Sequence, residues 1–184
     1  GANSIAVGVS SAARLTDSIA IGSGAATSYT GARVIAIGYK ASANSNDSVA
    51  IGSEAIANTN GISIGNGANA YTAPNSIVIG TSAYSQGPTG IAIGNASKVG
   101  NTGIAIGNNA YNTTGGLAVG NGAYAFNGAF AIGTNSKAEN GNALAVGVGA
   151  NAKSTNSMAL GTNAVSSNPI DVAIGLNANA SSSA

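Results

Sequence analysis

Residues 47–52 read Asp47-Ser48-Val49-Ala50-Ile51-Gly52, a large–small–large apolar triplet closed by a glycine. Variants of this pattern occur thirteen times along the 184 residues, at intervals of 13 to 16 residues. Alternation of large and small residues predicts a β-strand, because successive side chains point to opposite faces, and β-branched residues favour this state. The closing glycines are Gly8, Gly22, Gly38, Gly52, Gly65, Gly80, Gly94, Gly107, Gly120, Gly133, Gly147, Gly161 and Gly175.

A second, shorter strand is predicted after each glycine. Small residues recur three and five positions after it, as at Ala55 and Ala57, and turn-forming residues follow, as at 59–61. A unit of about 14 residues is shorter than helix-containing repeats, but it fits one turn of a parallel β-solenoid with two strands. We therefore expect residues 1–184 to form one all-β domain of about 13 stacked turns.

The alternation also predicts an orientation for the first strand. We expect the two large residues of each triplet to face inward, against the small residues of the second strand, and the middle alanine to face outward. Such alanines would form a flat outer face that another chain could approach closely, and we take this face or its border as a candidate seam between chains. The alternative is a tolerated exposed stripe. The residues concerned are Ala6, Ala20, Ala36, Ala50, Ala92, Ala105, Ala118, Ala131, Ala145, Ala159 and Ala173.

The composition argues against catalysis. The chain has no histidine and no cysteine, and its five carboxylates never recur at one position in adjacent turns, so neither a metal centre nor an acid–base pair is suggested. Only 6% of residues are charged and the net charge is +1, which predicts no attraction to nucleic acid. We expect no enzyme activity and no cofactor. The sequence also contains no recognisable secretory signal and no apolar run approaching the roughly 20 residues of a membrane helix.

The repeat resembles a known family. Residues 3–8, 47–52 and 156–161 are similar to the NSVAIG-type repeat of YadA-like heads, which belong to trimeric autotransporter adhesins of Gram-negative bacteria, and the resemblance runs from Asn3 to about Ala180. It implies a single-stacked left-handed parallel β-roll, a homotrimer, and display on a stalk anchored in the outer membrane. It also implies a role in virulence, through attachment to a host extracellular-matrix protein or cell-surface receptor. Because no heptad stalk, neck or anchor segment is recognisable, we expect the chain to be the head portion alone.

Two other functions stay open from the sequence. The chain could be a structural spacer that holds another binding domain away from the cell. It could also bind ice or an abiotic surface, as flat threonine ladders do, but Thr81, Thr134 and Thr162 share one position without occupying adjacent turns.

Two groups of residues are candidate ligand contacts. The first is an outward column four residues after the glycine, whose alternative interpretation is a solubilising stripe that packs on itself through cation–π contacts. The second is a loop cluster on a rigid scaffold. A column of Asn95, Asn108 and Asn121 is interpreted instead as a stabilising hydrogen-bond ladder. The column candidates are Tyr84, Lys98, Tyr111, Tyr124 and Lys137, and the loop candidates are Tyr29, Arg33, Tyr39 and Lys40.

Overall fold

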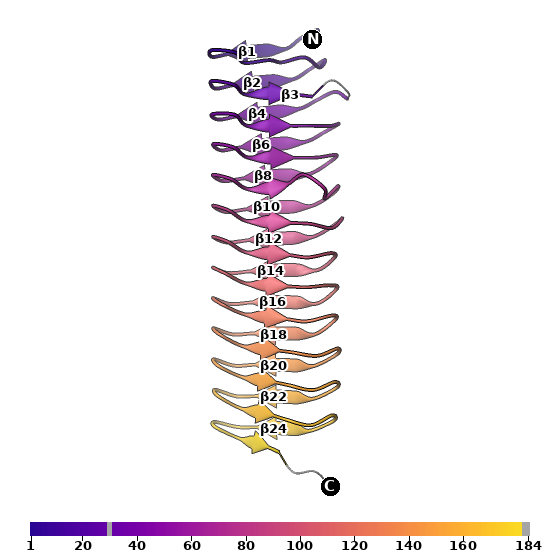
Figure 1. The fold of residues 1–184 in the computed structure, drawn as a ribbon, viewed down its shortest axis with the longest axis vertical. Coiled ribbons are helices and arrows are strands. Elements are labelled where there is room, and N and C mark those ends of the chain that lie inside the picture. The colour runs from indigo at the N-terminus through magenta and orange to yellow at the C-terminus, as the bar shows by residue number, and fades with distance from the viewer. Residues whose placement is uncertain (29–30, 182–184) are drawn as a thin grey trace. The chain divides into compact units, whose positions relative to one another are not determined.

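A computed structural model describes residues 1–28 and 31–181. The described residues form an all-β parallel solenoid of about 12–13 turns with about 14 residues per turn, and they contain no helix. The turns fall into two compact units, Gly1–Ala96 and Ser97–Ala184. Each turn contributes a three-residue strand to one sheet and, in most turns, a two-residue strand to a second sheet (Figure 1).

The first unit holds seven described strands of the first sheet and five of the second. The first sheet comprises β1 (Ile5–Val7), β2 (Ile19–Ile21), β4 (Ile35–Ile37), β6 (Val49–Ile51), β8 (Ile62–Ile64), β10 (Ile77–Ile79) and β12 (Ile91–Ile93). The second comprises β3 (Ala26–Thr27), β5 (Ser42–Ala43), β7 (Ile56–Ala57), β9 (Asn69–Ala70) and β11 (Tyr84–Ser85).

The second unit holds six described strands of the first kind and seven of the second. The three-residue strands are β14 (Ile104–Ile106), β16 (Leu117–Val119), β18 (Phe130–Ile132), β20 (Leu144–Val146), β22 (Met158–Leu160) and β24 (Val172–Ile174). The two-residue strands are β13 (Lys98–Val99), β15 (Tyr111–Asn112), β17 (Tyr124–Ala125), β19 (Lys137–Ala138), β21 (Asn151–Ala152), β23 (Val165–Ser166) and β25 (Asn179–Ala180).

Within each unit, equivalent positions of the repeat lie in register. Ala36 pairs with Ala50 between β4 and β6, and Leu117 pairs with Phe130 between β16 and β18, in parallel. Backbone hydrogen bonds join the turns, as where the Ile35 amide donates to the Ser48 carbonyl at 3.0 Å. Because the strands stack in this way, each repeat position becomes a column of side chains, and the predicted parallel solenoid is confirmed.

The interior is built from small side chains of both sheets. In the turn around β6 and β7, the residues with no exposed surface are Ser48, Ala50, Ala55 and Ala57, whereas Val49 and Ile51 point outward and are half-buried. The two strands of a turn are joined by short corners, and the space between the two sheets holds mostly alanine and serine with an occasional valine. Isoleucine pairs from every turn would overfill it.

The predicted orientation of the first strand is therefore wrong. The middle alanines face the interior rather than another chain, and only Ala6, in the first turn, is exposed. Alternation shows which residues share a face, but not which face is buried, and here the narrow interior selects the small side chain. The buried members of the predicted alanine seam are Ala20, Ala36, Ala50, Ala92, Ala105, Ala118, Ala131, Ala145, Ala159 and Ala173.

One larger interior side chain shows how little room there is. Asn112 is fully buried in β15, and its amide oxygen and nitrogen have no hydrogen-bond partner among the described residues. A Cβ on Gly103 would lie 2.5 Å from its Oδ1, and one on Gly116 would lie 3.0 Å from its Nδ2. Glycine in the flanking segments thus makes the space that an interior asparagine needs.

The turns between strands need unusual backbone conformations. The repeat glycine has φ near +130°, as at Gly65 with φ 136°, and two further corner residues per turn adopt the left-handed region, as Asp47 does with φ 53°. Asparagine and aspartate tolerate that region better than other L-residues, which explains their frequency at these corners.

Candidate ligand-binding surfaces

The outer side of the three-residue strands forms an apolar surface, which we call the aliphatic face. Large residues on either side of each buried alanine point outward, and neighbours in adjacent turns leave most of them half-buried, although Ile106 and Ile132 each remain 38% exposed. In the first unit the face consists of Ile5, Val7, Ile19, Ile21, Ile35, Ile37, Val49, Ile51, Ile62, Ile64, Ile77, Ile79, Ile91 and Ile93. In the second unit it consists of Ile104, Ile106, Leu117, Val119, Phe130, Ile132, Leu144, Val146, Met158, Leu160, Val172 and Ile174.

The outer side of the two-residue strands has a different character. In the second unit, Lys98, Tyr111, Tyr124 and Lys137 occupy four consecutive turns and pair in register through β13, β15, β17 and β19. We call these four residues the Lys–Tyr column. The predicted column is thus brought together for these four, whereas Tyr84 lies on β11 of the first unit, where it pairs with Asn69.

The two tyrosines of this column contact each other. Their ring centroids are 5.7 Å apart with an interplanar angle of 58°, and Tyr111 is 39% exposed while Tyr124 is half-buried. Burial raises the pKa of Tyr124, and the charges of Tyr111 and Glu139 raise it further, so the phenol stays protonated at neutral pH. The column therefore presents two aromatic rings between two lysine side chains.

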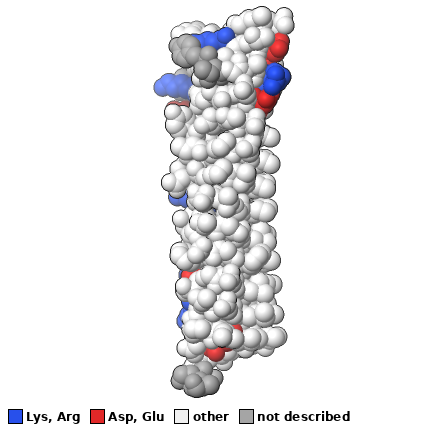
Figure 2. All heavy atoms as spheres, turned by 90° about the vertical axis from the view of Figure 1, so that its right-hand side faces the viewer, with Lys and Arg blue, Asp and Glu red and all other residues white. Residues whose placement is uncertain are grey.

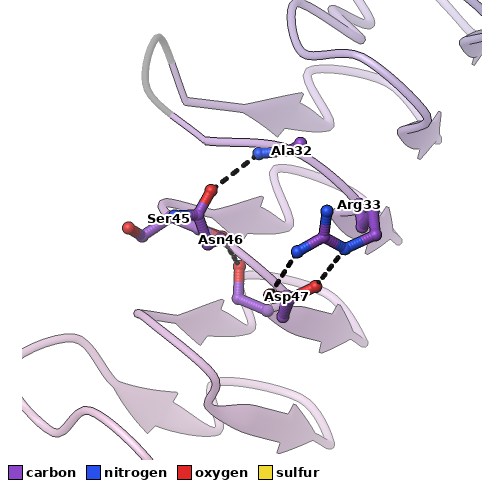
Figure 3. Close-up of polar contacts among 6 residues, drawn as sticks. Ala32, Arg33, Ser45, Asn46 and Asp47 are labelled. Atoms are coloured by element: carbon purple, nitrogen blue, oxygen red, sulfur yellow. Dashed lines mark hydrogen bonds and ion pairs between the residues drawn. The ribbon is translucent and has the colours of Figure 1, made fainter.

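The loop cluster is only partly assembled. The Arg33 guanidinium pairs with Asp47 of the next turn through Nε at 2.6 Å and Nη2 at 2.9 Å (Figure 3). This pairing raises the pKa of Arg33 and lowers that of Asp47. Lys40 Nζ lies 5.0 Å from the Tyr39 ring centroid, and the tyrosine raises the pKa of this lysine. Tyr29 lies outside the described residues. Arg33 is thus already engaged by a carboxylate, which leaves Tyr39 and Lys40 as the cation–aromatic pair here.

Asparagine ladders form, but at other positions than expected. No side-chain hydrogen bond joins Asn95, Asn108 and Asn121 in the part of the chain that the structure describes. The bonds form instead at the left-handed corners, where Asn60 donates to Asn75 at 2.9 Å and Asn142 to Asn156 at 3.3 Å. Corner geometry, which the residue types alone do not reveal, decides which amides can reach one another.

Charged groups are few on the face of the molecule that Figure 2 shows, most of which belongs to uncharged residues. Among residues 1–28 and 31–181, no group of three or more acidic, histidine or cysteine side chains could hold a metal ion. The same ranges contain no helix long and apolar enough to cross a membrane.

Comparison with known families identifies the repeat. The family model described as "YadA head domain repeat (2 copies)" matches residues 1–25, 30–55, 72–97, 127–150 and 138–164, together more than half of the chain. The chain belongs to the YadA head family. Curated proteins give no significant match.

YadA heads are non-enzymatic adhesin domains of autotransporters, and they are known to form trimers. The resemblance in the NSVAIG-like segments therefore identified the family correctly. The two outer surfaces described above differ in character: the aliphatic face is apolar, whereas the Lys–Tyr column bears cationic and aromatic side chains.

Proposed function

We propose that this chain is the head of a homotrimeric surface adhesin, exposed outside a bacterial cell and attached to its outer membrane by other parts of the protein. Its role is attachment to a host extracellular-matrix protein or cell-surface receptor, and thereby virulence. Membership in the YadA head family supports the adhesin role. The observation that carries the trimer is the aliphatic face, because an isolated chain would leave the large apolar side chains of this face in water in each unit.

The trimer seam passes along the aliphatic face. Three narrow solenoids whose interiors hold little beyond alanine and serine gain a second, larger apolar core when these faces meet. Interfaces between permanently associated subunits resemble such a core, since they are more apolar than the rest of the surface. The outer side of the two-residue strands then remains open to ligands, and three copies of it make binding multivalent.

A charge placed on the aliphatic face tests the seam. Ile51→Lys puts an ammonium at the outer side of β6, where it would be buried between chains at a cost of at least about 2 kcal/mol per copy. Ile56→Lys is the matched control, because Ile56 is half-buried on the outer side of β7 in the same turn. Sedimentation should show a trimer for the unaltered chain and for the control, and dissociation for Ile51→Lys. A monomeric unaltered chain, or equal behaviour of the two variants, contradicts the seam.

Attachment is tested on the same trimer. Binding of the purified head to surfaces coated with collagen or fibronectin, or to host cells, supports adhesion. A folded trimer that binds none of them contradicts the adhesin role and favours the structural spacer.

A further inference from the structure

The Lys–Tyr column has an ordered composition. Lys98 and Lys137 stand at its two ends, with Tyr111 and Tyr124 between them in adjacent turns. Stacked strands lie about 4.8 Å apart, so the two lysine Cα atoms are separated by roughly 14 Å along the direction of stacking. Cations at that separation with aromatic rings between them fit an extended ligand that runs across the turns.

Both lysines are available to a ligand. They are exposed, and neither forms an ion pair with a carboxylate within the described ranges. Neither ammonium lies over a tyrosine ring there, in contrast to Lys40 over Tyr39. The lysines of the column therefore do not pack on its tyrosines through cation–π contacts. The contact that forms within the column is the one between Tyr111 and Tyr124.

We propose that the Lys–Tyr column binds an anionic polysaccharide laid along the stacked turns. Sugar rings pack on the exposed faces of Tyr111 and Tyr124, and carboxylate or sulfate groups pair with Lys98 and Lys137. The tilted tyrosine pair offers apolar ring surface together with two phenol hydroxyls, which suits a ligand that is apolar on its ring faces and polar at its edges. The inference rests on the proposed function in one respect: the outer side of the two-residue strands must stay uncovered in the trimer.

Substitution of one acidic residue should strengthen ligand binding, a result that misfolding of the variant would not produce. Glu139 follows Lys137 by two residues, and its charge acts on Tyr124. An anionic ligand on the column is repelled by this carboxylate. Glu139→Gln should therefore strengthen binding, by about two- to fivefold at moderate salt.

The test measures binding of the purified trimer to an immobilised heparin oligosaccharide, with neutral dextran and poly-L-glutamate as comparison probes. Lys98→Gln combined with Lys137→Gln should weaken heparin binding about tenfold or more, because two charge-assisted contacts are lost. Tyr111→Ser should weaken it by about threefold to tenfold, while Tyr111→Phe retains the ring and most of the affinity.

Matched controls lie in the other unit. Arg14→Gln removes one positive charge from an exposed side chain and Tyr71→Ser removes a tyrosine that is 57% exposed, so both should change heparin binding by less than about twofold. The inference is overturned if heparin does not bind, if Arg14→Gln weakens binding as much as the column variants, or if Glu139→Gln weakens it. It is also overturned if poly-L-glutamate binds as tightly as heparin, because an acidic polypeptide is then the better occupant.

Its failure is distinguishable from failure of the proposed function. A trimer that attaches to collagen or to host cells but ignores heparin overturns this inference alone. A monomeric chain overturns the trimer, while its heparin binding still reports on the column, since all four residues belong to one chain.

Discussion

Alanine substitutions at two glycines of the same turn test whether close contact between stacked turns, and not the loss of glycine alone, determines the cost in stability. Gly65 and Gly67 flank Asn66 in the first unit, and both have positive φ, 136° and 63° respectively. A Cβ on Gly65 would lie 2.5 Å from the Gly80 carbonyl oxygen, whereas one on Gly67 would meet only Ser82 Oγ, at 3.9 Å. The two substitutions to alanine therefore add the same methyl group to very different surroundings.

The expected costs follow from these geometries. For Gly65→Ala, a backbone conformation reserved for glycine costs about 1–3 kcal/mol, and forcing the next turn away costs about as much again. We expect at least about 3 kcal/mol of destabilisation. For Gly67→Ala, the left-handed conformation costs about 1 kcal/mol, offset in part by the lower entropy of the unfolded chain. Ala96 already occupies the equivalent position of another turn with φ 53°, so alanine is tolerated there.

Denaturant unfolding followed by far-ultraviolet circular dichroism measures the difference, at one fixed protein concentration because association shifts apparent stability. The reasoning predicts that Gly65→Ala is less stable than Gly67→Ala by at least about 2 kcal/mol. Variants that agree within about 0.5 kcal/mol would refute it, because the stacked glycine column would then not constrain the turn.

Two further predictions concern the left-handed corners. Ile170 is a β-branched residue at φ 68° and is 74% exposed, so Ile170→Asn should raise the free energy of unfolding by about 1 kcal/mol, and Asn156→Ile at the equivalent corner should lower it similarly in the same assay. Arg33 lowers the pKa of Asp47 in the folded chain, so the pair stabilises the fold above the ordinary aspartate pKa of 3.8, and this contribution is lost as pH falls through the lowered value. Asp47→Asn should flatten acid unfolding curves in that range, and it should add nothing in an Arg33→Gln background; an additive effect there would contradict the pairing.

Much of the fold could be predicted from the sequence because the same repeat occurs thirteen times. The strand positions, the parallel stacking and the outward column of Lys98, Tyr111, Tyr124 and Lys137 all follow from the spacing of one triplet and one glycine. Position in a stacked solenoid is set by local alternation and turn chemistry, and both are visible in a single chain.

Which face of the first strand is buried could not be predicted in the same way. Burial of large apolar residues is the usual expectation for a single chain, and it placed Val49 and Ile51 inside and Ala50 outside. That expectation assumes that water covers the outer face of each chain. If another chain covers that face, the large residues can be buried there instead. No property of the triplet itself distinguishes a face covered by water from one covered by another chain.

The size of the interior decides between them. In the turn around β6 and β7, the four inward residues Ser48, Ala50, Ala55 and Ala57 are fully buried with side chains no larger than serine, and Asn112 fits beside Gly103 and Gly116. With isoleucine inside, the two sheets would have to move apart by more than turns this short allow. The large residues are therefore excluded from the chain's own core, and the apolar surface they form outside is better explained by a partner chain than by water. The large residues of the first strands do not occupy the outer side of the two-residue strands, and that is where exposed Lys98, Tyr111 and Lys137 and half-buried Tyr124 lie.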